Sequence, residues 1–209
     1  MLWQKAIGSR STKPLEIIGH THNRATSTTS LTIGLPSGSQ AGDFVFLFAT
    51  TTAGFSAAMN NPSGFTERFN SGGSSPKLVL STRVIQDPAP AGYTVTAGGS
   101  GDMNGILVVV RDAQFDLSAG VGEGSGNPIV FPSLTSSENN SILFCIPAGL
   151  NQTFTNADPD LTEIFLFNES SAQYGVFFDR VELGSTGSRS IDSTSNRSNR
   201  GLSFLVNPA

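Results

Sequence analysis

Hydrophobic residues occur along the chain in short runs, separated about every 8 to 15 residues by clusters of Gly, Pro, Asn, Asp and Ser that favour turns. Val, Ile, Phe and Thr fill the runs, and residues 93–96 alternate between apolar and polar side chains, as in a strand with one buried face. The runs cover residues 15–18, 31–35, 44–49, 65–69, 78–85, 93–96, 106–110, 115–117, 129–131, 142–146, 164–167, 176–183 and 202–206. Because no helically spaced stripe is present, the pattern predicts an all-β protein.

Two glycine-rich segments are predicted to interrupt the strands. Residues 97–102, with the sequence Ala-Gly-Gly-Ser-Gly-Asp, have the composition of a turn. Residues 120–126 contain four glycines, but Asn-Pro and another apolar run follow them where a nucleotide-binding loop would be followed by a helix. We therefore predict a flexible loop for residues 120–126.

Short sequence matches recur at a nearly constant offset of 96 or 97 residues. They are Pro36-Ser37 with Pro132-Ser133, Thr66-Glu67 with Thr162-Glu163, Arg83-Val84 with Arg180-Val181, Gly105 with Gly201, and Ala113 with Ala209. The joint between the two halves, residues 111–116, has no Pro, Gly or Ser linker. We predict one β-sandwich domain at residues 15–209, built from tandem repeats of about 96 residues at 15–113 and 114–209, after an N-terminal arm at 1–14.

The composition narrows the functional classes. Charged residues make up only 13% of the 209 residues and the formal net charge is −4, so a nucleic-acid groove with clustered Lys and Arg is not expected. No apolar run is long enough to span a membrane. The first residues lack a signal-peptide pattern, which favours synthesis in a cytoplasm. The single Cys145 lies in an apolar run and is expected to be a buried, unreactive thiol.

Candidate chemical sites are sparse. His20 and His22 would lie on the same side of a strand, but a zinc site needs three or four ligands, so we expect two solvated edge-strand histidines. No motif indicates a hydrolase, and we expect neither enzymatic activity nor a cofactor. Asp158 and Asp160 loosely resemble a calcium loop, which leaves calcium as a weaker alternative to an Asx-rich turn.

The N-terminal arm is basic and carries a large aromatic residue. Trp3, Lys5, Arg10 and Lys13 are therefore candidate partner-binding residues, since buried Trp and Arg often anchor interfaces. The alternative is an ordinary first strand followed by a polar loop.

Several strand-and-turn motifs resemble a module of tailed-phage virion proteins. They are the Gly-Asp start of residues 42–47, the Pro-Ser-Gly-Phe-Thr turn at 62–66, the basic-apolar end of residues 77–84, the Tyr-Thr-Val-Thr strand of residues 92–96, and the Asn-Pro-Ala end at 207–209. The resemblance covers about residues 30–209, although Phe65 stands where the family often has Trp. It implies a jelly-roll-like sandwich with a structural role and no catalytic residues.

The resemblance leads to two functional hypotheses. The first is a capsid decoration (cement) protein of a virion, a homo-oligomer with a trimer as our guess, which binds the major capsid protein and neither nucleic acid nor membrane. The alternative is a tail-fibre or baseplate module that binds host surface glycans, with Trp3, Phe55, Tyr93 and Tyr174 stacking on sugars.

Overall fold

The computed structural model describes residues 14–52, 58–71, 77–150, 153–168, 172–194 and 199–209. The regular elements in these ranges are β-strands, and their pairings are antiparallel. No helix in these ranges is long and apolar enough to cross a membrane. The all-β sandwich predicted from the sequence is confirmed.

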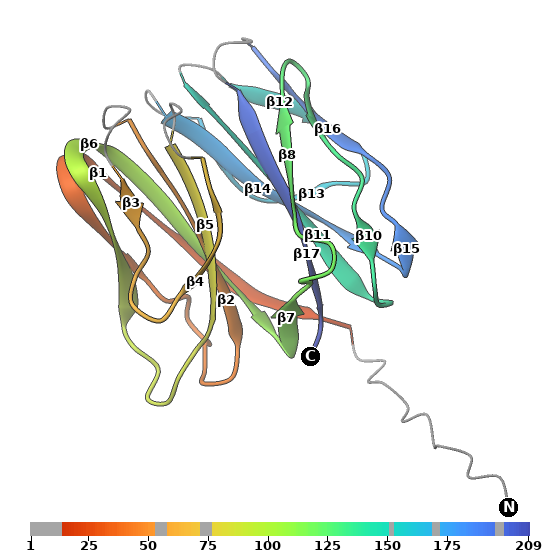
Figure 1. Cartoon of the computed structure of the whole chain (residues 1–209), viewed down its shortest axis with the longest axis horizontal. Coiled ribbons are helices and arrows are strands. Elements are labelled where there is room, and N and C mark those ends of the chain that lie inside the picture. The colour runs from red at the N-terminus through yellow and green to blue at the C-terminus, as the bar shows by residue number, and fades with distance from the viewer. Residues whose placement is uncertain (1–13, 53–57, 72–76, 151–152, 169–171, 195–198) are drawn as a thin grey trace, which may run out of the picture.

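Two main sheets form the centre of the molecule (Figure 1). The first main sheet has the order β1 (Glu16–Gly34), β6 (Gly92–Arg111), β2 (Phe44–Thr51), β5 (Lys77–Val84) and β4 (Thr66–Asn70), with β3 (Met59–Asn60) also paired to β6. The second has the order β13 (Thr162–Phe167), β14 (Ala172–Val181), β11 (Ser141–Leu150), β17 (Arg200–Pro208) and β7 (Ala113–Phe115), with β8 (Val121–Ser125) also paired to β17.

Two smaller sheets lie in the second half of the chain. One has the order β12 (Phe154–Ala157), β16 (Arg189–Ser193) and β9 (Ile129–Phe131). The other pairs β10 (Thr135–Ser136) with β15 (Gly184–Ser185).

The central core lies between the two main sheets. Phe44, Phe46 and Phe48 of β2 point into it, and Ile142, Phe144 and Ile146 of β11 meet them from the opposite sheet. The residues between them, such as Val45 and Leu143, point to the opposite face of each sheet and are equally buried there, in separate hydrophobic clusters. The main sheets are therefore buried on both faces, which explains why their apolar runs are continuous rather than alternating.

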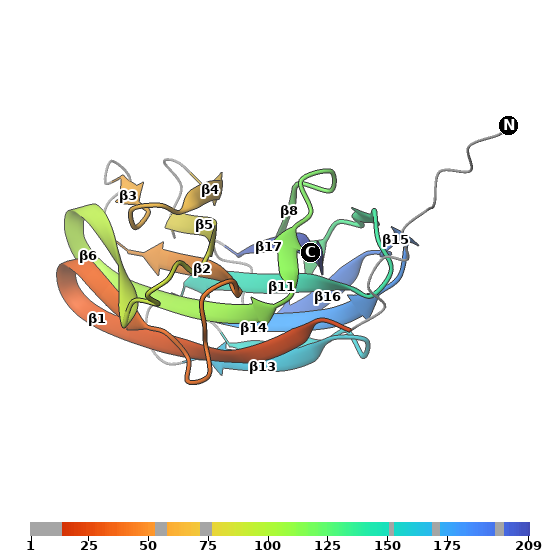
Figure 2. The same cartoon turned by 90° about the horizontal axis from the view of Figure 1, so that it is seen from below.

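The outer face of the first main sheet is covered by the sheet's own longest strands. β1 and β6 curl over it, so that Leu31 and Ile33 of β1 and Val95 of β6 pack against Val45 and Leu47 of β2 (Figure 2). The three-stranded sheet β12-β16-β9 covers the second main sheet in a corresponding way. Each main sheet thus has its own outer core in addition to the shared central core.

The turn predicted at residues 97–102 is wrong, because these residues lie inside β6. Within this stretch Gly101 pairs with Thr28 of β1, and Ala97 pairs with Met59 of β3. The pairing of β1 with β6 has register shifts on both sides of Thr28. Bulges bend a strand without ending it. The glycines therefore lie where the ribbon curves.

The two main sheets have corresponding strand orders, with β6, β2, β5 and β4 matched by β17, β11, β14 and β13. The edge strands β4 and β13 also share a register shift directly after Glu67 and Glu163. Arg68 and Ile164 follow these residues and so occupy corresponding bulge positions. The tandem duplication itself stays a prediction.

The register does not agree with every sequence match. Arg83 lies opposite Val45, which belongs to the outer core of the first main sheet. Arg180 lies opposite Ile142, which belongs to the central core. The match between Arg83 and Arg180 therefore joins positions on different faces of their sheets.

Candidate functional site

The central core has two lateral boundaries, and they are closed differently. At the first, which we call the β1–β13 seam, His22 of β1 contacts Phe165 and Phe167 of β13 with 4.9 Å between ring centroids in each pair. At the second, the β4–β7 seam, β4 and β5 of the first main sheet face the short strand β7. Here the two halves leave a groove of about 420 Å³.

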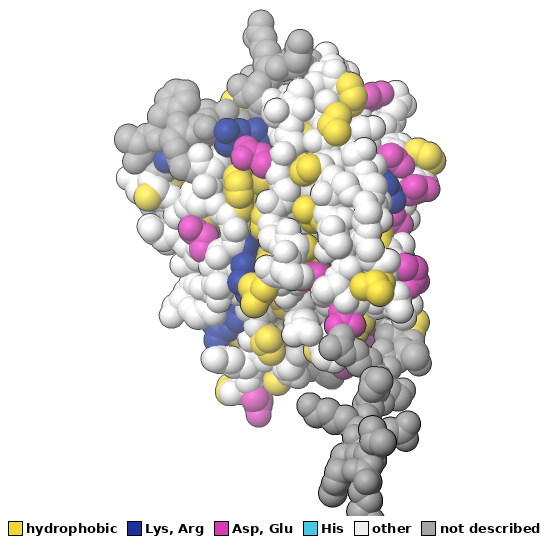
Figure 3. All heavy atoms as spheres, turned by 45° about the vertical axis from the view of Figure 1, so that its right-hand side comes forward, with side chains coloured by type: hydrophobic (Ala, Val, Ile, Leu, Met, Phe, Trp, Pro, Cys, Tyr) yellow, Lys and Arg dark blue, Asp and Glu magenta, His cyan; other side chains and the backbone are white. Residues whose placement is uncertain are grey.

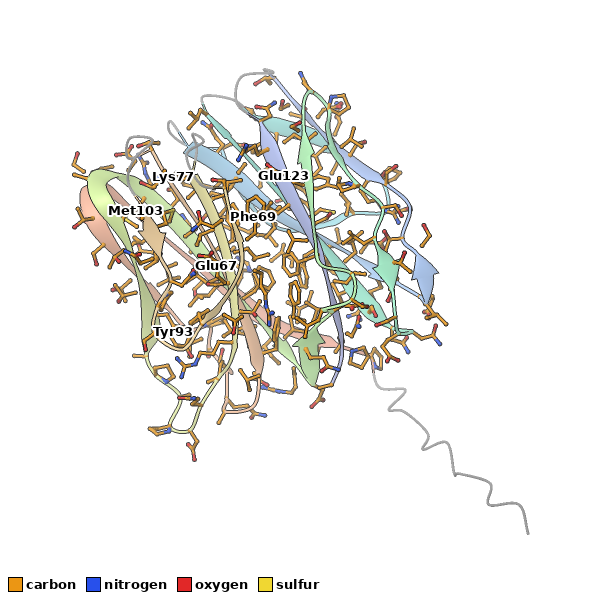
Figure 4. The ribbon with its side chains drawn as sticks, in the orientation of Figure 1. Glu67, Phe69, Lys77, Tyr93, Met103 and Glu123 are labelled. Carbon is orange, nitrogen blue, oxygen red and sulfur yellow. The ribbon has the colours of Figure 1, made fainter. Side chains whose placement is uncertain are left out.

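The groove is lined from both halves of the chain. Its lining residues are Phe44, Gly64, Thr66, Arg68, Thr82, Arg83, Val84, Gln86, Gln114, Phe115 and Leu117. Figure 3 shows Lys and Arg side chains beside hydrophobic ones along the boundary between the halves. In Figure 4, Glu67 and Phe69 of β4 lie next to this boundary, with Glu123 of β8 across it. The lining contains two arginines and no acidic residue.

Arg68 is the main charged group of the groove. Its guanidinium carbon lies 4.5 Å from the ring centroid of Phe115, and its Nε donates a hydrogen bond of 2.8 Å to Thr82 Oγ1. Burial lowers the pKa of Arg68 from its usual value. Its neighbour Glu67 instead accepts hydrogen bonds from Asn61 and Asn70. Among the described residues, no carboxylate forms an ion pair with Arg68.

Arg83 is held in place by backbone and aromatic contacts. It donates a hydrogen bond of 2.7 Å to the Ser63 carbonyl, and its guanidinium carbon lies 5.6 Å from the ring centroid of Tyr93. Gly64 permits this arrangement, because a Cβ there would lie 2.7 Å from an Arg83 nitrogen and the backbone has a φ of +81°. Arg83 thus supplies positive charge at one end of the groove but has less freedom to bind a ligand.

The groove also presents apolar surface at its edge. Val84 is 53% exposed and Leu117 is 73% exposed, which is unusual among the large hydrophobic side chains described. Phe115 is buried as part of the central core, where its ring stacks on Phe204, and Arg68 also lies over the ring. The site therefore combines guanidinium groups, side-chain amides and exposed aliphatic surface, which suits binding by contact more than acid–base chemistry.

Several buried or half-buried charged groups elsewhere are engaged in structural contacts. Asp43 binds Arg111 through two hydrogen bonds, of 2.9 Å from Nε and 3.0 Å from a terminal nitrogen. Arg189 donates a hydrogen bond of 2.6 Å to Asp179. Burial alone would raise the pKa of Asp116, but hydrogen bonds from Ser118 and other neighbours lower it to about 2. These contacts fasten loops to strand ends.

The predicted partner-binding residues Trp3, Lys5, Arg10 and Lys13 lie outside the described residues, as does most of the predicted arm. Nothing in the structure tests their role, and they stay a prediction.

The prediction of two solvated edge-strand histidines is confirmed for His20 and wrong for His22. Both lie on the edge strand β1, and His20 is exposed, with its ring 5.5 Å from that of Phe165. His22 is half-buried among aromatic rings. Burial lowers the pKa of both, and the charges of His20 and Arg24 lower that of His22 further. No group of three or more His, Cys, Asp or Glu side chains that could hold a metal occurs in the described ranges.

The calcium alternative receives little support from the local contacts. Asp158 Oδ1 accepts a hydrogen bond from the Asp160 backbone N–H, and the Leu161 N–H bonds to the Asp158 carbonyl, as in an Asx turn. Arg189 lies 3.5 Å from Asp160 and also pairs with Asp179. A cation at this loop would therefore have to compete with the Arg189 guanidinium.

The aromatic residues proposed for glycan stacking are partly contradicted. Tyr93 is 7% exposed and Tyr174 is fully buried, so neither presents a ring face to a sugar. Tyr93 lies on the buried face of β6, where its neighbour Thr94 is exposed, and Tyr174 lies in the central core. Trp3 and Phe55 lie outside the described residues.

The flexible loop predicted at residues 120–126 is wrong as well. Residues Val121–Ser125 form β8, paired with β17. A Cβ at Gly124 would lie 2.1 Å from the Val130 carbonyl oxygen, so this glycine allows β8 to approach the neighbouring backbone closely. The buried state expected for Cys145 is confirmed, and burial raises the pKa of its thiol.

Sequence reasoning missed the groove altogether. Arg68 and Phe115 lie in different predicted repeats, and no local motif links them. The one available signal was Arg68 itself, a charged residue within a predicted strand, where the second predicted repeat has Ile164. This signal does not show which residue Arg68 contacts.

Comparisons with known proteins leave the family open. No family model matches the chain, and no curated protein matches it. One similar solved structure is the crystal structure of BuGH86E322Q in complex with neoagarooctaose, with 9% identity and a TM-score of 0.23. The match covers 91% of this chain but only 33% of the BuGH86 chain. The second is a variant of oxalate decarboxylase from Bacillus subtilis, with 7% identity and a TM-score of 0.21. The match covers 94% of this chain and 78% of the decarboxylase chain. Such low TM-scores carry no argument about fold or function.

Proposed function

We propose that the protein is a non-enzymatic structural protein of a virion, and in the first place a capsid decoration protein that binds the major capsid protein. It would be made in the host cytoplasm and act as a homo-oligomer, with a trimer as the simplest arrangement. The single observation that carries the proposal is the double burial of both main sheets around a shared Phe-rich core. A β-sandwich packed in this way is rigid, and a capsid decoration protein has to keep its shape when it holds neighbouring capsid subunits together.

Two further observations support this proposal. The buried carboxylates Asp43 and Asp116 and the half-buried Asp179 bind neighbouring loops and strands. The family resemblance of the hairpin motifs points in the same direction. The glycan-binding alternative is less well supported, because Tyr93 and Tyr174 are buried.

Attachment to particles tests the proposal. The purified chain is mixed with capsids assembled from the major capsid protein of the same phage, and co-sedimentation and electron cryomicroscopy measure its occupancy. We expect saturable binding at symmetry-related positions on the head. Binding to isolated tails, or to no particle at all, would contradict the proposal.

The predicted arm is tested with the same particles. A chain without residues 1–14 should keep its fold, because the described strands begin at Glu16, but should lose attachment. Circular dichroism and thermal unfolding of the truncated chain serve as the control for folding. Full occupancy by the truncated chain would show that Trp3, Lys5, Arg10 and Lys13 are not the attachment residues.

A further inference from the structure

Among the residues that the structure describes, no carboxylate pairs with the half-buried guanidinium of Arg68. Its one hydrogen bond to a described residue uses Nε, and that bond goes to the neutral hydroxyl of Thr82. A partly desolvated cation without a counter-ion is costly unless some other group compensates it. The ring of Phe115 compensates it partly through a cation–π contact.

The fold does not require an arginine at this place. The corresponding bulge position of the second main sheet carries Ile164, which packs against the central core. At the β1–β13 seam this position thus carries an aliphatic side chain of the core, whereas at the β4–β7 seam it carries Arg68, which lines the groove. An arginine at this bulge position is therefore a feature of the first main sheet.

We propose that the β4–β7 groove binds an acidic side chain from an extended segment of a partner protein, with the carboxylate on Arg68 and apolar flanking residues on Leu117 and Val84. The inference rests on the proposed function, because it names a contact by which a structural protein would dock. The charge complementarity is local, since the groove lining holds two arginines and no acid although the whole chain has a net charge of −4.

A protein segment fits the groove better than a sugar does. Stacking of a sugar on an aromatic face is not available here, because the ring of Phe115 is 9% exposed and lies under Arg68. The exposed surface here is aliphatic, and Gln86 offers an amide group that matches a peptide backbone. Gln114 offers its amide oxygen, since its nitrogen donates a hydrogen bond to the Pro208 carbonyl.

Peptide titration followed by NMR tests the inference on the full chain. The probes are N-acetyl-Leu-Glu-Leu-amide, its Gln counterpart, and sodium glucuronate. We expect the Glu peptide to shift the Arg68 Nε–H signal and the side-chain amide signals of Gln114, and to bind at least about tenfold more tightly than the Gln peptide, since hydrogen bonds between charged groups are the stronger ones. Equal binding of both peptides, or no shift with either, would overturn the inference, as would tighter binding of glucuronate.

Two variants complete the experiment. Arg68→Met removes the charge but keeps an unbranched side chain that packs well on Phe115, and it should abolish the preference for the Glu peptide. The control is Arg24→Met, because Arg24 also lies near a Phe ring, 6.0 Å from that of Phe167, but at the β1–β13 seam. A preference for Glu that survives in Arg68→Met would overturn the assignment to Arg68. The titration needs no particles, so its failure is distinguishable from failure of capsid attachment.

Discussion

The ring of Phe46 on β2 packs against the ring of Phe144 on β11, with 4.8 Å between centroids and an interplanar angle of 66°. The two residues come from opposite halves of the chain and both are fully buried. Edge-to-face aromatic pairs add to the free energy gained from apolar burial. This contact joins the halves at the centre of the shared core.

Removing one of these rings should strongly destabilise the protein. Phe144→Ala is expected to lower the free energy of unfolding by about 3–5 kcal/mol, because it removes apolar contacts and leaves a cavity. Denaturant unfolding followed by fluorescence measures the change. The control is Val130→Ala, which alters a residue that is 48% exposed and should cost at most about 0.5 kcal/mol. Similar losses in both variants would contradict the central position of Phe144.

The first half alone should not fold as a stable monomer. A fragment of residues 15–113 would expose the face of β2 that carries Phe44, Phe46 and Phe48. We expect it to aggregate or to bind a hydrophobic dye without a cooperative thermal transition. A soluble monomeric fragment with a sharp transition would show that the halves are separate domains and would contradict the prediction of one domain.

Asp116 should stabilise the fold less in acid. Its pKa is about 2 in the folded protein, below the ordinary value of 3.8, so its contribution is present above pH 3.8 and is lost as the pH falls toward 2. Asp116→Asn should therefore lower the free energy of unfolding by about 1–2 kcal/mol at pH 7. The difference from the unaltered chain should shrink steadily below pH 4. A difference that does not depend on pH would show that the charge of Asp116 is unimportant.

The histidines should make the protein sensitive to mild acid. Because the pKa of both His20 and His22 is lowered by folding, the unfolded chain binds more protons below its ordinary histidine pKa of 6.5. The free energy of unfolding should thus decrease as the pH falls through 6.5 and level off below the folded-state values. Melting temperatures between pH 7.5 and 5.5 measure this effect. The double variant His20→Gln and His22→Gln should show a flatter profile, and an unchanged slope would contradict the explanation.

Gly124 should not tolerate a side chain. Gly124→Ala places a Cβ against the Val130 carbonyl oxygen, and overpacking of this kind costs about 1–3 kcal/mol. Gly34→Ala is the matched control, since its Cβ would be 3.7 Å from the nearest atom, an ordinary contact. Thermal unfolding should separate the two variants clearly. Equal stability would mean that β8 does not approach residue 130 as closely as described.

The sequence alone determined the class of the fold. Short apolar runs rich in Val, Ile and Phe, with turn residues between them, leave a β-sandwich as the consistent solution, because each strand must bury its side chains against another layer. It also placed Cys145 in the interior, since an uncharged thiol within an apolar run has no reason to be exposed. These properties depend on local composition and spacing.

Only the tertiary structure decided where the strands bend and which surfaces remain open. Residues 97–102 look like a turn in isolation but lie inside β6, where Ala97 pairs with β3 and Gly101 pairs with β1. The contact between Arg68 and Phe115 depends on how two sheets pack across the shared core, and residues so distant in sequence carry no local sign of each other. Strand pairing and sheet packing are long-range properties, so the groove at the β4–β7 seam exists only in the folded chain.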